Sequence, residues 1–426
     1  MRKVTPQRVV TKDALNTTGL PDNVQVTLAE IAGAAREGVL ALSVACGLAV
    51  VTEIMQADVT RICGPRGKHD RNRSVYRHGD EPRLVPLGGA MVGIDKPRMR
   101  SKQGREVSLA TYEVFASRDM LDEIALGRML AGLSTRRYRA GGEPFGDVDL
   151  RGTSRSAVSR RFVRGTQAKI AELFGRDLQG LDLLAVFIDG MNVGEHLIVV
   201  ALGVDSKGTK HPLGLWEGTT ENKAVCSALI RNLLDRGLPA EHALLFVIDG
   251  GKGIRAAIDA AWGRLAVVQR CRKHKERNVT DHLPKTERTF IGRKLKAAWA
   301  NPDPVGAERE LRSLAKHLEL EHPGTAGSIR EGLEETLTVT RLGLTPSLLR
   351  TFKSTNPIES MISINRDAHR NVKRWRSGEM AMRWVAAGML DAEKQFRKVN
   401  GYRDLHILKR ALECHTDVIE GRRQIA

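Results

Sequence analysis

The chain has few cysteines and no long apolar run, and both absences exclude classes of protein. Five cysteines in 426 residues are too few for the disulfide framework of a secreted scaffold, and they favour a reducing compartment. The longest apolar stretch, from Gly38 to Val51, has about 14 residues, whereas a helix that spans a bilayer needs about 20. The stretch also lies too far along the chain for a secretion signal. We therefore expect a cytoplasmic protein with no membrane partner.

Negative charge is scarce as well. The chain has 68 Lys and Arg residues against 50 Asp and Glu residues, which gives a formal net charge of +18 at pH 7. At 41% hydrophobic residues it can bury sizeable cores, so it is not a disordered basic tail. An excess of cations matches a polyanionic partner, because phosphate contacts supply affinity that does not depend on sequence. A basic surface that only keeps the protein soluble is the alternative, but the charge favours a nucleic acid.

The first part of the chain combines helical and ribbon-like patterns. The residues from Val26 to Ala32 and the small-residue run Ala41–Val51 indicate helices. Residues 61–110 carry 12 Lys and Arg residues against 5 Asp and Glu residues. Glycines and prolines there separate short segments such as Leu84–Leu87 and Met91–Ile94, a pattern typical of a β-ribbon or loop.

Residues 116–175 return to helical periodicity, with a break at Gly132 and Ser134. Thr153 or Ser154 can N-cap the helix that follows the break. Its inward positions are Val158, Phe162 and Val163, and its outward positions are Arg155, Ser159 and Arg160. A helix, a turn and a basic helix resemble a helix-turn-helix, whose second helix enters the major groove of DNA. An ordinary helical hairpin with a solvated basic face is the alternative.

From about residue 181 the pattern predicts an α/β domain with a five-stranded mixed sheet. The predicted strands are Leu183–Ile188, Leu197–Val204, Pro212–Trp216, Ala243–Ile248 and Leu265–Val268. The first three strands form an antiparallel meander, and a helix capped by Thr220 follows them. Three antiparallel strands followed by helix, strand, helix and strand is the order of an RNase H-like core. In this topology the first and fourth strands are neighbours.

Two carboxylates mark the ends of those neighbouring strands. Asp189 and Asp249 each stand where a buried apolar strand stops and a glycine follows. Ligands bind at strand ends in open α/β sheets, so both carboxylates could point into one cleft. An isolated buried pair would repel, whereas Mg²⁺ accepts carboxylate oxygens and keeps sites for water or phosphate. The alternative is that each Asp-Gly pair only starts a turn.

A third acidic residue, Glu359, opens a later helix in the segment Asn356–Glu359. Spacing alone favours a cap, because Asn356 is a good N-cap, Pro357 suits the first helical position and Glu359 completes a capping box. A metal ligand on a helix beside the first strand is the alternative.

A basic stripe is predicted on the same helix after Glu359. Arg366, Arg370 and Lys373 fall at positions i, i+4 and i+7 beside Arg374. A stripe of this kind suits the phosphate backbone of DNA, and a solvated helix face is the alternative.

Four stretches carry these motifs and their neighbours: Phe187–Gly190, Val247–Gly253, Cys271–His274 and Ser354–Ser360. Together they resemble the Mutator-type bacterial insertion-sequence transposases. The likeness covers about residues 181–400 well, the segment Ser154–Phe162 more loosely, and residues 1–110 only in general style.

The resemblance implies an RNase H-like core with an Asp, Asp, Glu triad. Asp189, Asp249 and Glu359 would hold two Mg²⁺ ions, for which Mn²⁺ could substitute, and Asp189 would bridge both. One ion would activate water or later a DNA 3′-hydroxyl, and the other would stabilise the leaving 3′ oxygen. No covalent protein–DNA intermediate is required.

The resemblance also implies a helical insertion domain, with Trp299 as its packing tryptophan. Cys271 and His274 match the Cys-x-x-His motif of the family, and we expect them to organise the cleft or the insertion. Zinc is a poor interpretation of this pair, because no second ligand pair stands at suitable spacing.

We therefore predict a DNA transposase that binds its terminal inverted repeats, cleaves DNA and transfers strands. The expected regions are a DNA-end-binding region (1–110), a helix-turn-helix-like domain (111–180), the first part of the catalytic core (181–274), the helical insertion (275–345), and the last part of the core with basic C-terminal helices (346–426). Two ends must be joined, so we expect a homodimer or higher oligomer on double-stranded DNA, associated with the bacterial nucleoid in the cytoplasm. The alternative is a non-catalytic, domesticated DNA-binding regulator of the same fold, and a structure-selective or RNA-directed nuclease is a third possibility.

Overall fold

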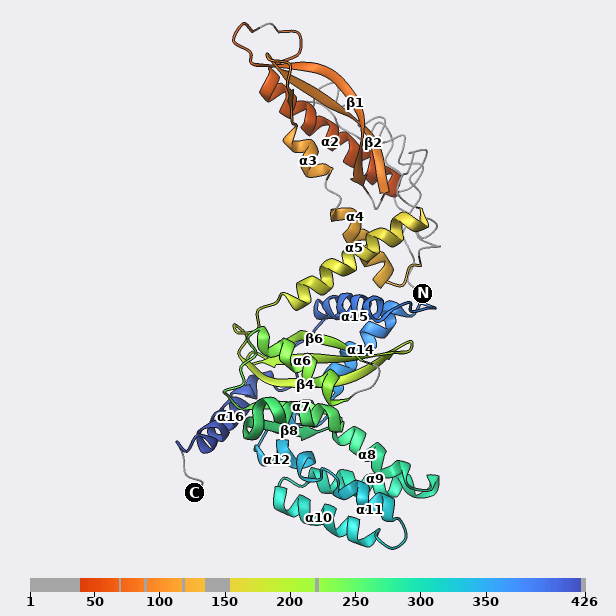
Figure 1. Ribbon diagram of the computed structural model, residues 1–426, viewed down its shortest axis with the longest axis vertical. Coiled ribbons are helices and arrows are strands. Elements are labelled where there is room, and N and C mark those ends of the chain that lie inside the picture. Colours follow the sequence, from red (N-terminus) through yellow and green to blue (C-terminus); the bar gives the residue numbers. More distant parts are fainter. Residues whose placement is uncertain are drawn as a thin grey trace, which may run out of the picture. The chain divides into compact units, whose positions relative to one another are not determined.

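The described residues form two compact units that divide between Gly165 and Thr166 (Figure 1). The computed structural model describes residues 39–68, 70–87, 90–116, 119–134, 154–218 and 222–422. The predicted helix around Val26–Ala32 and the proposed caps Thr153 and Thr220 lie outside these residues. No helix in the described segments combines the length and the apolar character needed to cross a bilayer.

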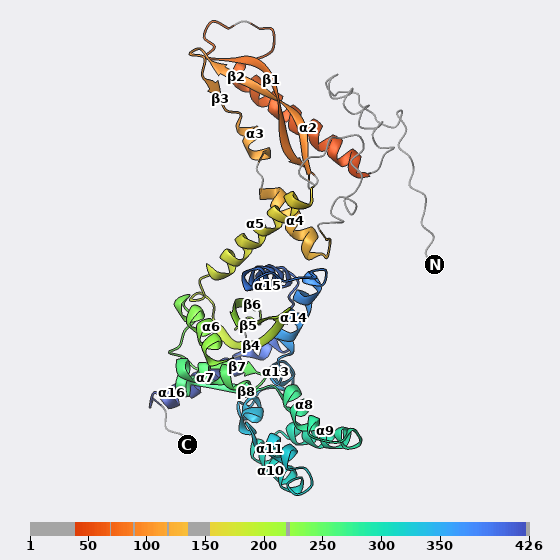
Figure 2. The same ribbon diagram turned by 45° about the vertical axis from the view of Figure 1, so that its right-hand side comes forward.

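In the described part of the first unit, a long helix packs on an antiparallel ribbon (Figure 2). Its elements are α2 (Val39–Cys63), β1 (Val75–Leu87), β2 (Ala90–Ser101), β3 (Glu106–Val107) and α3 (Ala110–Phe115). Leu84 pairs with Gly93 and Val85 with Val92, so the predicted ribbon is confirmed. Met55 and Met99 are fully buried in the small core between helix and ribbon.

Two further helices follow the ribbon, α4 (Asp119–Leu130) and α5 (Arg155–Phe174). Gly132 has a φ of +92°, which ends α4 and confirms the predicted break. The Ser154 hydroxyl accepts a hydrogen bond from the amide of Ala157, so Ser154 acts as the predicted N-cap of α5. The predicted outward face of α5 is confirmed, because Arg155, Ser159 and Arg160 are exposed. On the predicted inward face, Val158 and Phe162 are buried and Val163 is half-buried.

The second unit is built on a five-stranded mixed sheet of order β6-β5-β4-β7-β8. The strands are β4 (Leu183–Val193), β5 (His196–Asp205), β6 (Lys210–Gly218), β7 (Leu244–Ile248) and β8 (Ala266–Arg270). Strands β4, β5 and β6 pair antiparallel, and β4, β7 and β8 pair parallel. The predicted strand order, with the first and fourth strands as neighbours, is therefore confirmed.

Helices cover both faces of this sheet. One face carries α6 (Lys223–Asp235) and α7 (Lys252–Trp262); the other carries α13 (Pro346–Phe352), α14 (Asn356–His369), α15 (Gly378–Glu393) and α16 (Leu405–Ile419). Side chains alternate along a strand, so Val186 and Ile188 of β4 pack towards α6 and α7, and Phe187 packs towards α13 and α14. Phe187 stacks on Phe352 of α13, with ring centroids 6.0 Å apart. This packing holds the strand that carries Asp189. The N-cap of α6 is Asn222, whose side chain accepts from the amide of Val225.

The segment between β8 and α13 is all-helical, as predicted for residues 275–345. Its elements are α8 (Arg272–Asp281), α9 (Lys285–Ala300), α10 (Pro304–His317), α11 (Pro323–Arg330), the 3-10 helix η4 (Glu334–Leu337) and α12 (Thr338–Arg341). These helices share a core of their own, and α9, α10 and α11 gather away from the sheet (Figure 2). Trp299 is 7% exposed in that core, and its indole Nε1 donates to Thr336 Oγ1 at 3.0 Å.

Candidate active site

Asp189 lies within β4, not at its end. The strand continues to Val193, and Asp189 pairs with Val200 of β5. The prediction that the strand stops at Asp189 is therefore wrong, because the buried residues Met191 and Val193 carry the apolar side of the strand beyond the glycine. Alternation places Asp189 on the same face as Phe187, which is the face covered by α14.

Asp249 follows the neighbouring strand β7 directly. Phe187 and Val247 are partners in the parallel register, so Asp189 and Asp249 stand at the same level two residues later. Asp249 Oδ1 accepts a hydrogen bond from the amide of Gly251 at 2.8 Å, and Gly250 has a φ of +103°. The Asp-Gly pair therefore makes a turn here, as the alternative interpretation required, while the charge of Asp249 still acts on Asp189.

The two aspartates interact electrostatically. Burial and then the charge of Asp249 raise the pKa of Asp189 to about 6, although the His274 ring and the Gly190 amide act in the opposite direction. The Gly190 amide donates to Asp189 Oδ1 at 2.9 Å. A pair of carboxylates in this setting favours either a proton or a bound cation, and oxygen ligands suit hard divalent ions.

Glu359 approaches from the first turn of α14. Its Oε1 lies 2.9 Å from the Thr355 hydroxyl, and its Oε2 lies 2.6 Å from Lys273 Nζ. Burial acts to raise the pKa of Glu359, but the hydrogen bonds from Lys273 and Thr355 outweigh burial and hold the pKa below its ordinary value. The carboxylate is thus kept ionised at the cleft.

The capping-box interpretation of Glu359 is wrong. The residue that precedes α14 is Thr355, not Asn356, and no side chain caps this helix end. Glu359 therefore lies one position too far along the helix for a capping box. The amide of Thr355 instead donates to Cys271 Sγ at 3.4 Å. The Glu359 side chain is left to face Lys273 and His274.

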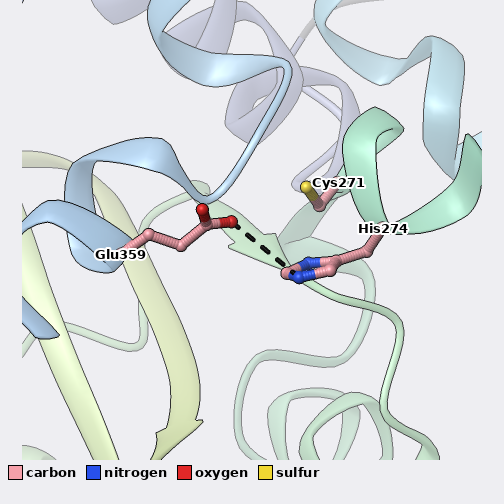
Figure 3. A group of neighbouring side chains, drawn as sticks. All are labelled: Cys271, His274 and Glu359. Carbon is pink, nitrogen blue, oxygen red and sulfur yellow. Dashed lines mark ion pairs between the residues drawn. The ribbon is translucent and has the colours of Figure 1, made fainter. Parts of the chain in front are cut away.

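Cys271, His274 and Glu359 converge between α8 and α14 (Figure 3). Their ligand atoms lie within 4.8 Å of one another, and no other group of at least three such residues does so within the described ranges. Cys271 is fully buried at the N-cap of α8, and His274 follows one turn later. His274 Nε2 lies 3.8 Å from Glu359 Oε1. Asp189 and Asp249 do not join this group.

The cysteine and the histidine interact, and each favours the charged form of the other. The hydrogen bond and the charge of Cys271 raise the pKa of His274 to about 9, with smaller contributions from Asp189 and Glu359. Burial acts to raise the pKa of Cys271, but hydrogen bonds from His274 and Thr355 outweigh it and lower the pKa. The pair therefore places a cationic ring between Asp189 and Glu359.

Asp189, Glu359, Lys273 and His274 line a cleft of about 740 Å³, and Arg366 lines it too. Trp299 lines a neighbouring pocket of about 460 Å³, which shares Lys273 with the cleft. The structure thus brings most of the predicted core residues to one place, with Asp249 adjacent to Asp189. Lys273 was not predicted as a site residue, because its contact with Glu359 joins segments 86 residues apart. Thr355 was missed although it lies only four residues before Glu359.

The predicted basic stripe is only partly helical. Helix α14 ends at His369, and Arg370 is its C-cap, so Lys373 and Arg374 lie in the segment before α15. Trp375 explains the departure, because its ring contacts His369 edge-on at 5.3 Å and packs against Gly194 in the turn between β4 and β5. All four cationic residues are nevertheless exposed.

Comparison with known proteins points to a single family. The sequence model described as "Transposase, Mutator family" matches residues 23–399. A transposase for insertion sequence element ISRM5 from Rhizobium meliloti is 26% identical, over 84% of this chain and 90% of its own length. The transposase for insertion sequence element IS1081 from Mycobacterium tuberculosis is 24% identical, over 88% of this chain and 90% of its own. A probable transposase from Corynebacterium diphtheriae is 28% identical, over 57% of this chain and 68% of its own.

Proposed function

The chain belongs to the Mutator family of transposases, and we propose that it is a DNA transposase with an RNase H-like core. It would bind the terminal inverted repeats of its insertion sequence and catalyse metal-dependent strand cleavage and strand transfer at the cleft. One observation carries the proposal. Asp189 on β4 lies close enough to Asp249, which directly follows the neighbouring strand β7, for the two charges to interact, and Asp189 lines the same cleft as Glu359 of α14.

The three carboxylates fit a divalent metal centre by the chemistry of their donors. The raised pKa of Asp189 supports this assignment, because burial beside a second carboxylate favours a neutralising cation. Two Mg²⁺ or Mn²⁺ ions bound by Asp189, Asp249 and Glu359 would supply activation of water or a 3′-hydroxyl and stabilisation of the leaving 3′ oxygen.

The chain's own residues prepare this site. Thr355 orients one oxygen of Glu359, and the burial of β4 and β7 fixes the two aspartates. Arg366 at the cleft, with the exposed cations that follow it, would bind DNA phosphates. In the other unit, the outward face of α5 would contact the transposon ends through Arg155, Ser159 and Arg160. A homodimer or larger assembly would join the two ends.

The test uses the full-length protein and DNA that flanks its coding sequence, with and without Mg²⁺. We expect cuts at the inverted repeats that need the metal and that fall at least about 1,000-fold in Asp189→Asn, which corresponds to about 4 kcal/mol. Asp367→Asn, an exposed aspartate on α14, is the matched control and should cleave normally. DNA binding should survive in both variants.

Three other outcomes would contradict the proposal. Cleavage by Asp189→Asn at the wild-type rate would remove Asp189 from the mechanism. Tight binding without cleavage under any divalent metal would indicate a domesticated regulator. Cleavage that ignores the sequence of the transposon ends would indicate a nuclease.

A further inference from the structure

Lys273 lines the cleft, but the proposed metal centre of Asp189, Asp249 and Glu359 gives it no role. Its Nζ lies 2.6 Å from Glu359 Oε2, the oxygen that Thr355 does not contact. The Lys273 side chain is 61% exposed, whereas that of Glu359 is 27% exposed. An ion pair with one partner this exposed is weak, because water competes for the ammonium group. The pair can therefore be broken without disturbing the fold.

The backbone beneath Lys273 is firmly held. The amide of Cys271 donates to the carbonyl of Ile248 at 2.7 Å, and the amide of Arg272 donates to the carbonyl of Lys353 at 2.9 Å. The Arg272 guanidinium is 8% exposed and donates to the Thr336 and Trp299 carbonyls and to Thr340 Oγ1. The exposed side chain of Lys273 has no comparable set of buried contacts beyond its ion pair with Glu359.

We propose that Lys273 is a displaceable internal cation of the active site. It pairs with Glu359 in the metal-free protein, and metal binding at Glu359 releases its ammonium group to a DNA phosphate in the same cleft. The inference rests on the proposed role of Glu359 as a metal ligand. A metal ion at Oε2 would compete with the ammonium group, because two cations close to one oxygen repel each other.

The released ammonium group can reach two adjacent hollows of the surface. Lys273 lines both the cleft with Asp189 and Arg366 and the neighbouring pocket with Lys296 and Asn356. Its flexible four-carbon stem lets the charge move between these sites, and a lysine ammonium group is a good point ligand for phosphate. Metal binding and DNA binding would then reinforce each other through one side chain.

The chain offers a matched control in the ion pair of Lys296 with Glu276. These side chains are 65% and 25% exposed, and Nζ lies 2.8 Å from Oε1. Length, exposure and charge nearly equal those of the Lys273–Glu359 pair, and Glu276 lines the same cleft, but Glu276 is not one of the three proposed metal ligands. Lys296→Gln therefore reports the effect of removing a positive charge near the cleft without freeing Glu359.

The experiment titrates Mn²⁺ into full-length protein without DNA and follows free Mn²⁺ by electron paramagnetic resonance. Lys273→Gln should bind Mn²⁺ about 2- to 5-fold more tightly than wild type, the range that corresponds to the loss of an exposed ion pair. Lys273→Arg and Lys296→Gln should bind like wild type. Thermal unfolding of each variant checks that the fold is unchanged.

A second readout measures DNA affinity in chelator and in Ca²⁺ at several salt concentrations. In wild type, the slope of log DNA affinity against log salt should be steeper with the metal than in chelator, by the amount expected for about one additional phosphate contact. In Lys273→Gln the metal should not change this slope. An equal increase in both proteins would contradict the release of Lys273 to DNA.

Glu359→Gln distinguishes a failure of the Lys273 displacement from a failure of the metal-binding role of Glu359. If it loses Mn²⁺ affinity while Lys273→Gln binds like wild type, the displacement inference is overturned and the metal role of Glu359 survives. If Glu359→Gln binds Mn²⁺ like wild type, Glu359 is not a ligand and both proposals fail.

Discussion

The strand-borne and helix-borne parts of the candidate active site are held in different ways. Asp189 and Asp249 are placed by the register of two buried parallel strands. Glu359 is placed by polar contacts, with Thr355 directly before its own helix and with Lys273 on α8, 86 residues earlier in the sequence. Apolar packing fixes a carboxylate rigidly, whereas an exposed ion pair leaves one adjustable. The proposed metal site would therefore have a rigid half, Asp189 and Asp249, and an adjustable half, Glu359.

The largest expected effect comes from removing the apolar packing that holds the rigid half. Phe187→Ala removes a fully buried ring that stacks on Phe352 two residues before Asp189, and should lower the free energy of unfolding by about 3–5 kcal/mol. Urea unfolding measures the loss. Phe290→Ala, at a ring that is 53% exposed, should change stability by less than about 0.5 kcal/mol. Equal losses in the two variants would mean that the packing behind Asp189 is not rigid.

The next effect concerns the charge of Asp189 in the rigid half. It is seen in the free energy of unfolding, measured in chelator without metal. The pKa of Asp189 in the folded protein, about 6, lies above its ordinary value of 3.8. The folded state therefore holds a proton that the unfolded state loses, so stability falls as pH rises from about 4 to about 6 and stays lower above that. Asp189→Asn removes this penalty and should be more stable than wild type at pH 7.5 by at most about 3 kcal/mol.

The stability difference between Asp189→Asn and wild type should shrink towards zero near pH 4, as followed by chemical denaturation across the pH range. Asp367→Asn is the control and should show no such trend. A constant difference at all pH values would show that Asp189 is not buried beside a second charge.

A smaller effect tests the adjustable half. Thr355→Val keeps the shape of the side chain but removes the hydroxyl that contacts Glu359 Oε1, a hydrogen bond to a charged group that contributes about 1.5–3 kcal/mol. Strand cleavage should fall about 10- to 100-fold, while DNA binding stays the same. Thr355→Ser restores the hydroxyl and should recover most of the rate. Equal losses in Val and Ser variants would assign Thr355 a packing role only.

The smallest effect lies outside both halves, on the exposed cations after α14. Lys373→Gln should reduce the slope of log affinity against log salt by about 0.9, because one phosphate contact is lost. Lys316→Gln is the matched control. Lys316 is an exposed lysine in the separate helix α10, and its substitution should leave the slope unchanged. A slope that is the same in wild type and Lys373→Gln would leave this segment as a solvated surface.

Much of the sheet could be predicted because strand patterns are local. The five apolar runs and their order follow from the residues themselves, and the neighbouring first and fourth strands follow from that order. The extension of β4 beyond Asp189 could not be predicted, because Gly190 and Asn192 look like breakers. Only the pairing with β5 shows that Met191 and Val193 continue the buried side.

The candidate site was less predictable, because it depends on contacts between distant segments. Spacing alone favoured a cap at Glu359, and nothing near it in sequence shows that Thr355 and Lys273 reach its two oxygens. The end of α14 was missed for a similar reason, since Trp375 draws the chain towards the turn at Gly194. The resemblance to a transposase family supplied the proposed metal-binding role of Glu359, which periodicity did not predict.

The central claim is that Asp189, Asp249 and Glu359 hold one metal centre, and metal-directed cleavage of the protein itself tests it most directly. Fe²⁺ bound in place of Mg²⁺ generates hydroxyl radicals with ascorbate and peroxide, which cut the chain next to the metal. We predict cuts near residues 189, 249 and 359, all suppressed by excess Mg²⁺. Cuts confined to the segment around Cys271 and His274, and unaffected by Mg²⁺, would contradict the claim and assign the metal to the thiol and imidazole pair.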